Sequence, residues 1–153
     1  MKSAPPPAAI LSDPLQNMVG YQLRRVSLAM AADLAARLED LNLTVLGLSV
    51  LLMIEANPGV TQSDLGRSLG VKRANMAPLT AQLVERDLIV RKPTDGRSHG
   101  LDLTEAGRTL TRAAWPSVGA SETHCLSSLG PPARAQLVEI IADLRKAVPR
   151  SDP

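Results

Sequence analysis

The stretch that decides the fold runs from residue 61 to residue 104 and reads TQSDLGRSLGVKRANMAPLTAQLVERDLIVRKPTDGRSHGLDLT. It begins with the hydroxyl of Thr61, followed three residues later by the carboxylate of Asp64, which is close to the capping box that starts a helix. Gly66 is small where two helices must cross, and Gly70 can adopt the left-handed conformation that a tight turn needs. This order predicts a helix-turn-helix, whose apolar seam consists of Leu65, Leu69, Val71, Met76 and Leu79.

The second helix of this pair is expected from about Lys72 to Asp87 and has the composition of a DNA-recognition helix. Cationic side chains bind phosphates or guanine edges, an asparagine amide pairs with adenine, and a small apolar side chain contacts a thymine methyl. The exposed face is predicted to carry Lys72, Arg73, Asn75, Ala77 and Thr80. Pro78 is unusual inside such a helix, because proline removes a backbone hydrogen bond and should disturb the first turns.

Two extended runs after this helix predict a β-hairpin. Residues 89–92 and 99–103 flank a turn at 93–96 that contains an Asp-Gly pair, which is a hairpin signal. A basic hairpin beside a helix-turn-helix is placed as a wing that reaches phosphates or an adjacent minor groove, although an ordinary solvated hairpin is the alternative. The cations near its tip are Arg91, Lys92, Arg97 and His99.

Residues 61–107 resemble the core of the multiple antibiotic resistance regulator (MarR) family. Four stretches are similar to the family's motifs: TQSDLG at 61–66, LVERDLI at 83–89, DGRS at 95–98 and LTEAG at 103–107. The resemblance implies a homodimer in which each subunit reads one half of a palindromic DNA operator. It also implies a pocket between the dimerisation and DNA-binding regions for a small phenolic or other aromatic effector, whose binding releases the DNA.

The wing residues Asp95 and Arg97 match the family's motif, so the resemblance assigns them the wing role, with Asp95 placed to brace Arg97. Lys72 departs from the small capping residue that is often seen at the start of the recognition helix. The predicted DNA-binding residues are Thr61, Gln62, Ser63, Lys72, Arg73, Asn75, Ala77, Thr80, Arg91, Lys92, Asp95, Arg97 and Ser98.

Helices are expected on both sides of this stretch. Apolar residues at steps of three and four predict an amphipathic helix that begins at Ser12-Asp13-Pro14 and runs to about residue 41. A helix from about Thr44 to Ala56 is apolar on most sides, as a central core helix would be. Two more helices are expected at about 104–129, with a kink at Trp115-Pro116, and at about 131–148.

The predicted fold class is mostly α with a small β-hairpin wing: a winged helix-turn-helix plus a helical dimerisation region formed by both termini. A single MarR-like domain is expected over 12–148, with dimerisation helices at 12–42 and 105–148, a DNA-binding lobe at 44–104, and flexible ends at 1–11 and 149–153. Apolar stripes on terminal helices without a partner in so short a chain suggest burial against a second copy. A homodimer is therefore expected.

Composition limits the alternatives. The chain has 153 residues, 44% of them hydrophobic and 21% charged, which suits a single globular domain. Its net charge of +2 says little about nucleic acid by itself, but residues 66–100 hold seven Lys or Arg against three Asp or Glu. With one Trp, one Tyr and no Phe, the core favours packed helices. A cytoplasmic protein is expected, because the first residues do not resemble a signal peptide.

An effector pocket is predicted less directly, between the first, second and fifth helices. Arg24 and Arg25, with Tyr21 one turn earlier, are candidates to hold an anionic or phenolic effector, and a solvated face or a dimer ion pair is the alternative. Ser49 and Met53 are candidates for the same pocket, with core packing as the alternative for Met53. His99 is placed to touch either DNA or the effector, or to be a plain surface histidine.

Cys125 is the only cysteine, which excludes an intramolecular disulfide and fits a reducing compartment. A redox-sensing role for this thiol is an alternative to simple packing. His124 beside it is a possible partner, but adjacent helical positions are expected to point apart. With two histidines and one cysteine, no metal site and no cofactor are predicted.

Two functional classes remain besides a ligand-responsive repressor. A winged-helix module that binds another protein is possible, because a fold does not fix a function. An enzyme is not expected, since no nucleophile, base and orienting group occur at a workable spacing and no phosphate-binding glycine loop is present.

Overall fold

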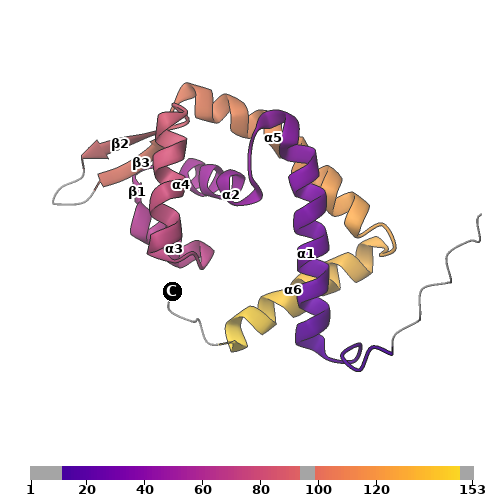
Figure 1. Ribbon diagram of the computed structural model, residues 1–153. Coiled ribbons are helices and arrows are strands. Elements are labelled where there is room, and N and C mark those ends of the chain that lie inside the picture. Colours follow the sequence, from indigo (N-terminus) through magenta and orange to yellow (C-terminus); the bar gives the residue numbers. More distant parts are fainter. Residues whose placement is uncertain (1–11, 94–98, 149–153) are drawn as a thin grey trace, which may run out of the picture.

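A computed structural model describes residues 12–93 and 99–148 of the chain. Within these ranges the protein is mostly helical with a small antiparallel sheet, which confirms the predicted fold class (Figure 1). The elements are α1 (Val19–Leu38), a 3-10 turn (Glu39–Leu41), α2 (Val45–Ala56), β1 (Val60–Thr61), α3 (Gln62–Leu69), α4 (Arg73–Glu85), β2 (Ile89–Pro93), β3 (His99–Leu103), α5 (Glu105–Cys125) and α6 (Pro131–Ala147).

The prediction that the first helix begins at the Ser12-Asp13-Pro14 sequence is wrong. Residues 14–17 form a turn, and α1 begins at Val19 without a side-chain cap at Met18. Asp13 accepts the backbone N–H of Leu15 at 2.9 Å, and the N–H of Met18 donates to the carbonyl of Leu15 at 2.9 Å. Because these short-range bonds close a turn, the capping residue serves that turn instead of a helix.

The centre of the molecule is a winged-helix lobe, residues 44–104, which contains α2 to β3. α2 begins close to the predicted Thr44, which caps the helix by accepting the N–H of Gly47 at 2.9 Å. The hairpin strands β2 and β3 pair in antiparallel register from Ile89 opposite Leu103 to Pro93 opposite His99. The short strand β1 adds to the other edge of β3 and gives the sheet order β1-β3-β2, a pairing that two residues of sequence do not reveal.

The core lies around α2, which is buried on most sides. Leu48, Val50, Leu51 and Ile54 are at most 2% exposed, and they pack with apolar residues of α3, α4 and the sheet. The terminal helices lie outside this core: α1 packs against α5 (Figure 1), and α6 lines an apolar groove together with residues 23–30 of α1. Of the α1 residues only Leu38 is buried, and α6 has no buried residue.

One junction joins the lobe to α5. The Thr104 hydroxyl accepts the N–H of Gly107 at 2.9 Å, which caps α5, and donates to the carbonyl of Asp87 at 2.6 Å. Gly107 is required here, because a Cβ at this position would lie 2.0 Å from the carbonyl oxygen of Leu88. The position of α5 is therefore tied to the loop that joins α4 to the sheet.

The helix boundaries follow the local chemistry. α5 ends at Cys125, four residues earlier than the sequence predicts, because the N–H groups of Ser127 and Leu129 bond three residues back in tight turns before Gly130. The helix continues through Pro116. None of the described helices combines the length and apolar character needed to cross a membrane.

Candidate functional site

The helix-turn-helix is built as its sequence predicts. The Thr61 hydroxyl donates to Oδ2 of Asp64 at 2.6 Å and accepts the Asp64 N–H at 3.2 Å, which starts α3. The same hydroxyl and the guanidinium of Arg67 lower the pKa of Asp64. At the turn, Gly70 has a φ of 65°, and a Cβ on Gly66 would lie 2.9 Å from the carbonyl oxygen of Val71. Both glycines are therefore used where the sequence places them.

Helix α4 exposes most of the face that the sequence assigns to DNA. Lys72, which lies at the N-cap, and Arg73, Asn75 and Ala77 are exposed. Pro78 is also exposed and lies inside a helix that stays continuous, so the carbonyl left without an N–H donor, that of Ala74, is at the surface.

The prediction that Thr80 belongs to this exposed face is wrong. Its side chain is fully buried, and its hydroxyl lies 2.9 Å from Oε1 of Gln62 and 3.0 Å from the carbonyl oxygen of Met76. The hydroxyl therefore fastens α4 to the start of α3. Because the Gln62 oxygen takes part in this contact, Gln62 is also held in place and is only partly exposed.

A polar hollow of about 300 Å³ lies where α3, α4 and the sheet meet. Five predicted DNA-binding residues line it, and they come from three separate parts of the sequence. Two guanidinium groups and an imidazole face this hollow, and no carboxylate lines it among residues 12–93 and 99–148, so the surface suits the phosphates of a nucleic acid backbone. The lining residues are Thr61, Gln62, Ser63, Arg73, Arg91, His99 and Leu101.

In the described part of the wing, Lys92 is engaged in an ion pair, whereas the sequence suggests that it is available for DNA. The Lys92 ammonium forms an ion pair with Oδ2 of Asp102 on the neighbouring strand. The other oxygen of Asp102 accepts the N–H of Gly59 at 2.7 Å, and Lys92, together with this N–H, lowers the pKa of the Asp102 carboxyl. Lys92 remains 62% exposed and braces the sheet, while Arg91 faces the hollow. Asp95, Arg97 and Ser98 lie outside the described residues.

The residues predicted for the effector do not gather in one place. On α1 the Arg25 guanidinium stacks over the Tyr21 ring at 5.7 Å from its centroid and lies 3.8 Å from Oδ2 of Asp13. Arg24 is an exposed neighbour on the same helix.

The three remaining effector candidates lie elsewhere. The Ser49 hydroxyl donates to the carbonyl of Val45 at 3.0 Å, and Met53 packs against the core of the lobe. His99 lines the polar hollow at the sheet and does not line the cavity between α2 and α5. The six side chains therefore form no common pocket.

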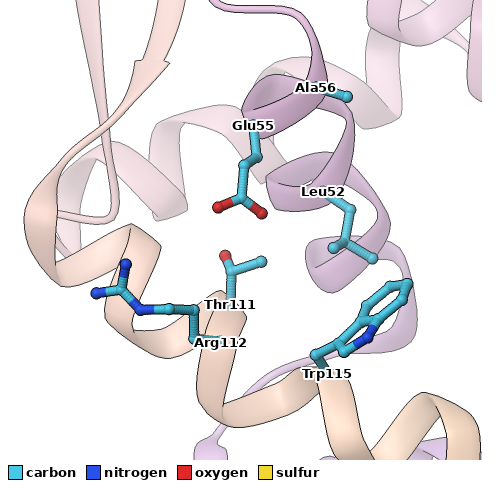
Figure 2. Close-up of a pocket in the computed structure, with 6 residues that line it drawn as sticks. All are labelled: Leu52, Glu55, Ala56, Thr111, Arg112 and Trp115. Carbon is cyan, nitrogen blue, oxygen red and sulfur yellow. The ribbon is translucent and has the colours of Figure 1, made fainter.

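A larger cavity of about 680 Å³ lies between α2 and α5. Figure 2 shows the Glu55 carboxylate pointing toward the Thr111 hydroxyl, with the Trp115 indole and Leu52 together on one side and Arg112 on the other. The Arg112 guanidinium is held by Oε1 of Glu105 at 3.1 Å. An apolar wall with one cation and one carboxylate suits an aromatic ligand with polar substituents. The lining residues are Leu52, Glu55, Ala56, Thr111, Arg112 and Trp115.

Sequence reasoning placed the pocket near α2 and α5 but missed every residue that lines this cavity. Glu55 and Arg112 are 57 positions apart in the chain, and nothing in the local sequence indicates that the two helices face one another. The one signal in the sequence was that Trp115 is the only tryptophan of the chain. The structure adds that this large apolar side chain is 58% exposed.

A second, apolar groove of about 520 Å³ lies between α1 and α6. It is the open side of the apolar stripes that the sequence predicts on the terminal helices. Its lining residues are Leu23, Val26, Ser27, Met30, Ile141, Leu144, Arg145 and Val148.

The structure corrects one expectation about Cys125 and His124, which were expected to point apart. Both lie at the C-terminal end of α5 with their ligand atoms, Sγ and an imidazole nitrogen, within 4.8 Å of each other and of a carboxylate oxygen of Asp33 on α1. Adjacent helical positions differ in direction by about 100°, which still lets both side chains reach the carboxylate of Asp33 on the neighbouring helix.

Comparison with known proteins agrees with this arrangement. The sequence model described as "MarR family" matches residues 41–98. A putative transcriptional regulatory protein for the hcr operon of Thauera aromatica is 32% identical over 103 residues, which cover 65% of this chain. The match spans 62% of the length of that relative.

Solved structures of two regulators are similar over most of their length. The transcriptional repressor CouR bound to a 23-mer DNA duplex is 34% identical, with a TM-score of 0.80 over 86% of this chain and 94% of that chain. CouR bound to p-coumaroyl-CoA gives a TM-score of 0.83 at 29% identity, over 91% and 99% of the two chains. A MarR family protein of Mycobacterium tuberculosis in complex with p-aminosalicylic acid gives 0.70 at 27% identity, over 82% and 97%.

Proposed function

The chain belongs to the MarR family, and from this premise we propose that it is a DNA-binding transcriptional repressor that acts as a homodimer and is released from a palindromic operator by a small aromatic effector. The observation that carries the proposal is the polar hollow, where Arg73 of the recognition helix and Arg91 of the wing face one space beside the exposed start of α4. The similar repressor CouR has been solved on a DNA duplex, which supports the same use of this surface here.

The exposed start of α4 enters the major groove, where Arg73 and Asn75 meet base edges or phosphates. Arg91 sits on the sheet and neutralises a backbone phosphate. Its contribution is electrostatic, so it is sensitive to salt and insensitive to sequence.

Selection from a random duplex library, followed by binding titrations at several salt concentrations, tests this function. The enriched site is expected to be an inverted repeat. Arg73→Ala should weaken binding by about tenfold to a hundredfold, and Arg91→Ala should also reduce the salt slope by about one. Lys146→Ala removes the same charge from α6 and should leave binding unchanged. If no duplex is enriched at low salt, the chain does not act on DNA, and a protein-binding role takes the place of this one.

The homodimer is proposed from the groove between α1 and α6. Apolar residues that remain 39–67% exposed on these helices, among them Val26, Ile141 and Leu144, are what a second copy would cover. Leu144→Glu should convert the dimer to a monomer in sedimentation equilibrium, and Val84→Glu on α4 is the matched control, since Val84 is 37% exposed but lies in the lobe. A wild-type chain that is a monomer at every concentration would contradict the proposal.

The effector is proposed to bind in the α2–α5 cavity, with its ring against Trp115 and Leu52. Arg112 takes an acidic group once it leaves Glu105, and Glu55 accepts a hydrogen bond from a phenolic hydroxyl. The cavity volume is within the usual range for small-molecule sites. p-Aminosalicylic acid, which is bound in one similar structure, carries both a phenolic hydroxyl and an acidic group, and p-coumaroyl-CoA, which is bound in another, carries a phenolic ring.

Because Trp115 is the only tryptophan, its fluorescence reports directly on this cavity. Titration with salicylate and with other hydroxylated aromatic acids should quench the emission, and the quenching ligand should release the operator. Arg112→Ala should weaken an acidic ligand by about tenfold. The parallel variant Arg24→Ala tests the site that the sequence alone suggests on α1. If Arg24→Ala loses more affinity for the ligand than Arg112→Ala does, the effector binds on α1 and not in this cavity.

A further inference from the structure

A cluster of three metal-ligating side chains lies apart from the DNA surface and from the effector cavity. Asp33 of α1 meets His124 and Cys125 of α5, with Nδ1 of His124 at 2.7 Å from Oδ1 of Asp33. One ligand atom from each of the three residues lies within 4.8 Å of the other two. Two helices that are 91 positions apart at this contact are thus joined by a carboxylate, an imidazole and a thiol.

The donor set selects a narrow class of ligand. Thiolate, imidazole and carboxylate together suit a borderline-soft divalent cation, and zinc commonly takes three protein ligands and a water in a tetrahedral arrangement. Zinc bonds of about 2.0–2.3 Å would set the ligand atoms about 3.5 Å apart, which needs only side-chain adjustment from the present positions. His124 is 68% exposed at its side chain, so an ion can enter from solvent.

The neighbours of Asp33 orient its carboxylate and lower its pKa. Nε of Arg37 donates to Oδ2 of Asp33 at 2.7 Å, and Oδ1 lies 3.4 Å from Nη2 of Arg37 and 2.7 Å from Nδ1 of His124. Arg37 and the hydroxyl of Ser121 hold the pKa of Asp33 well below its usual range, so the carboxylate is charged at neutral pH. An outer partner of this kind orients a ligating carboxylate, while its positive charge reduces the affinity for the cation.

We propose that Asp33, His124 and Cys125 form a binding site for one zinc ion that clamps α1 to α5. On binding, the ion takes the Asp33 carboxylate, the unprotonated ring nitrogen of a neutral His124 and the Cys125 thiolate, so the proton of the thiol is the one that passes to solvent. The clamp acts at the end of α5 remote from the lobe, so it changes how firmly the proposed dimerisation helices are held and leaves the DNA surface itself unaltered.

Cobalt titration of the untagged full chain tests the site, because a thiolate ligand gives a near-ultraviolet charge-transfer band and the chain has a single cysteine. Wild type should show this band with one equivalent of Co²⁺, and Zn²⁺ should displace the cobalt and raise the melting temperature. Cys125→Ser should lose the band. His124→Gln and Asp33→Asn should each weaken binding by about tenfold or more.

His99→Gln is the matched control, since it changes the only other histidine and should bind cobalt with the affinity of wild type. Far-ultraviolet circular dichroism of the metal-free variants shows whether they are folded. If Asp33→Asn does not fold, His124→Gln still tests the site, because the His124 side chain is exposed. A missing band in wild type overturns the proposal. If both His124→Gln and Asp33→Asn bind cobalt with unchanged affinity, the proposal is also overturned, because the band would then come from the thiol alone.

Discussion

The winged-helix lobe buries its apolar residues, whereas the terminal helices leave many of theirs exposed. In the lobe, Leu48, Leu51 and Leu65 are at most 2% exposed, and α2 is surrounded by other elements. On α6 no residue is buried, and Val138 and Ile140 are 67% and 51% exposed. The lobe therefore completes its core within one chain, whereas the terminal helices carry apolar faces that the described part of the chain leaves uncovered. The difference separates a region stabilised by its own packing from a region suited to assembly.

The largest effect that this difference predicts comes from matched truncations in the two regions. Leu51→Ala removes a fully buried side chain and should lower the free energy of unfolding by about 3 kcal/mol. Leu144→Ala on α6, where the side chain is 39% exposed, should cost less than about 1 kcal/mol in the monomer. Urea denaturation at protein concentrations below the association range measures both. Equal costs would mean that α6 is packed as firmly as the lobe.

A second pair of changes tests the junction between the two regions, and both lie on α5. Gly107→Ala places a Cβ against the carbonyl of Leu88 and should destabilise the chain by about 2 kcal/mol. Gly119→Ala meets nothing within 4 Å and should stabilise the helix by up to about 1 kcal/mol. Thermal melts of the two variants should therefore shift in opposite directions. If both melting temperatures rise, the backbone at Leu88 can move away from the new Cβ at position 107 without loss of stability.

A smaller effect is expected from the threonine at the same junction. Thr104→Ala removes the cap of α5 and the hydrogen bond to Asp87, with an expected loss of about 1 kcal/mol. Thr123→Ala, an exposed position later in α5, serves as the control and should change stability by less than about 0.5 kcal/mol. Hydrogen exchange should show faster opening at the start of α5 in Thr104→Ala alone. Equal exchange in both variants would exclude the capping role.

The smallest expected effect concerns acid. The pKa of Asp102 is lowered by Lys92 in the folded lobe, so its carboxylate stabilises the fold above its unfolded pKa of about 3.9, and this contribution is lost as the pH falls through the folded value. Asp102→Asn should therefore reduce stability at pH 7 and flatten its dependence on pH below about 4. Denaturation midpoints between pH 2 and 7 measure this change. A variant with the same acid dependence as wild type would show that the ion pair contributes nothing.

Local rules account for the elements that the sequence predicted well. Thr44, Thr61 and Thr104 each accept a hydrogen bond from an N–H three residues later, and such caps depend only on neighbouring residues. Gly70 likewise meets a local demand for positive φ. The start of α1 was mispredicted by the same reasoning, because the capping sequence at Ser12-Asp13-Pro14 stabilises a turn equally well.

The candidate sites were predictable only in part. Arg73 and Arg91 follow from a basic recognition helix and a basic wing, yet the burial of Thr80 depends on the position of Gln62, 18 residues earlier. The cavity residues Glu55 and Arg112, and the contact of Asp33 with His124, join helices far apart in the chain. Periodicity shows that a helix has an apolar face but not which helix that face meets.

The sequence alone thus determined the helix-turn-helix, its caps and turn, the hairpin after it and the apolar stripes of the terminal helices, because each depends on residues a few positions apart. Tertiary structure decided which polar side chains meet: the hollow between α3, α4 and the sheet, the cavity between α2 and α5, and the carboxylate–imidazole–thiol cluster between α1 and α5. The physical reason is that these contacts depend on how whole helices pack, which is set by the shape of the complete core and not by any local pattern.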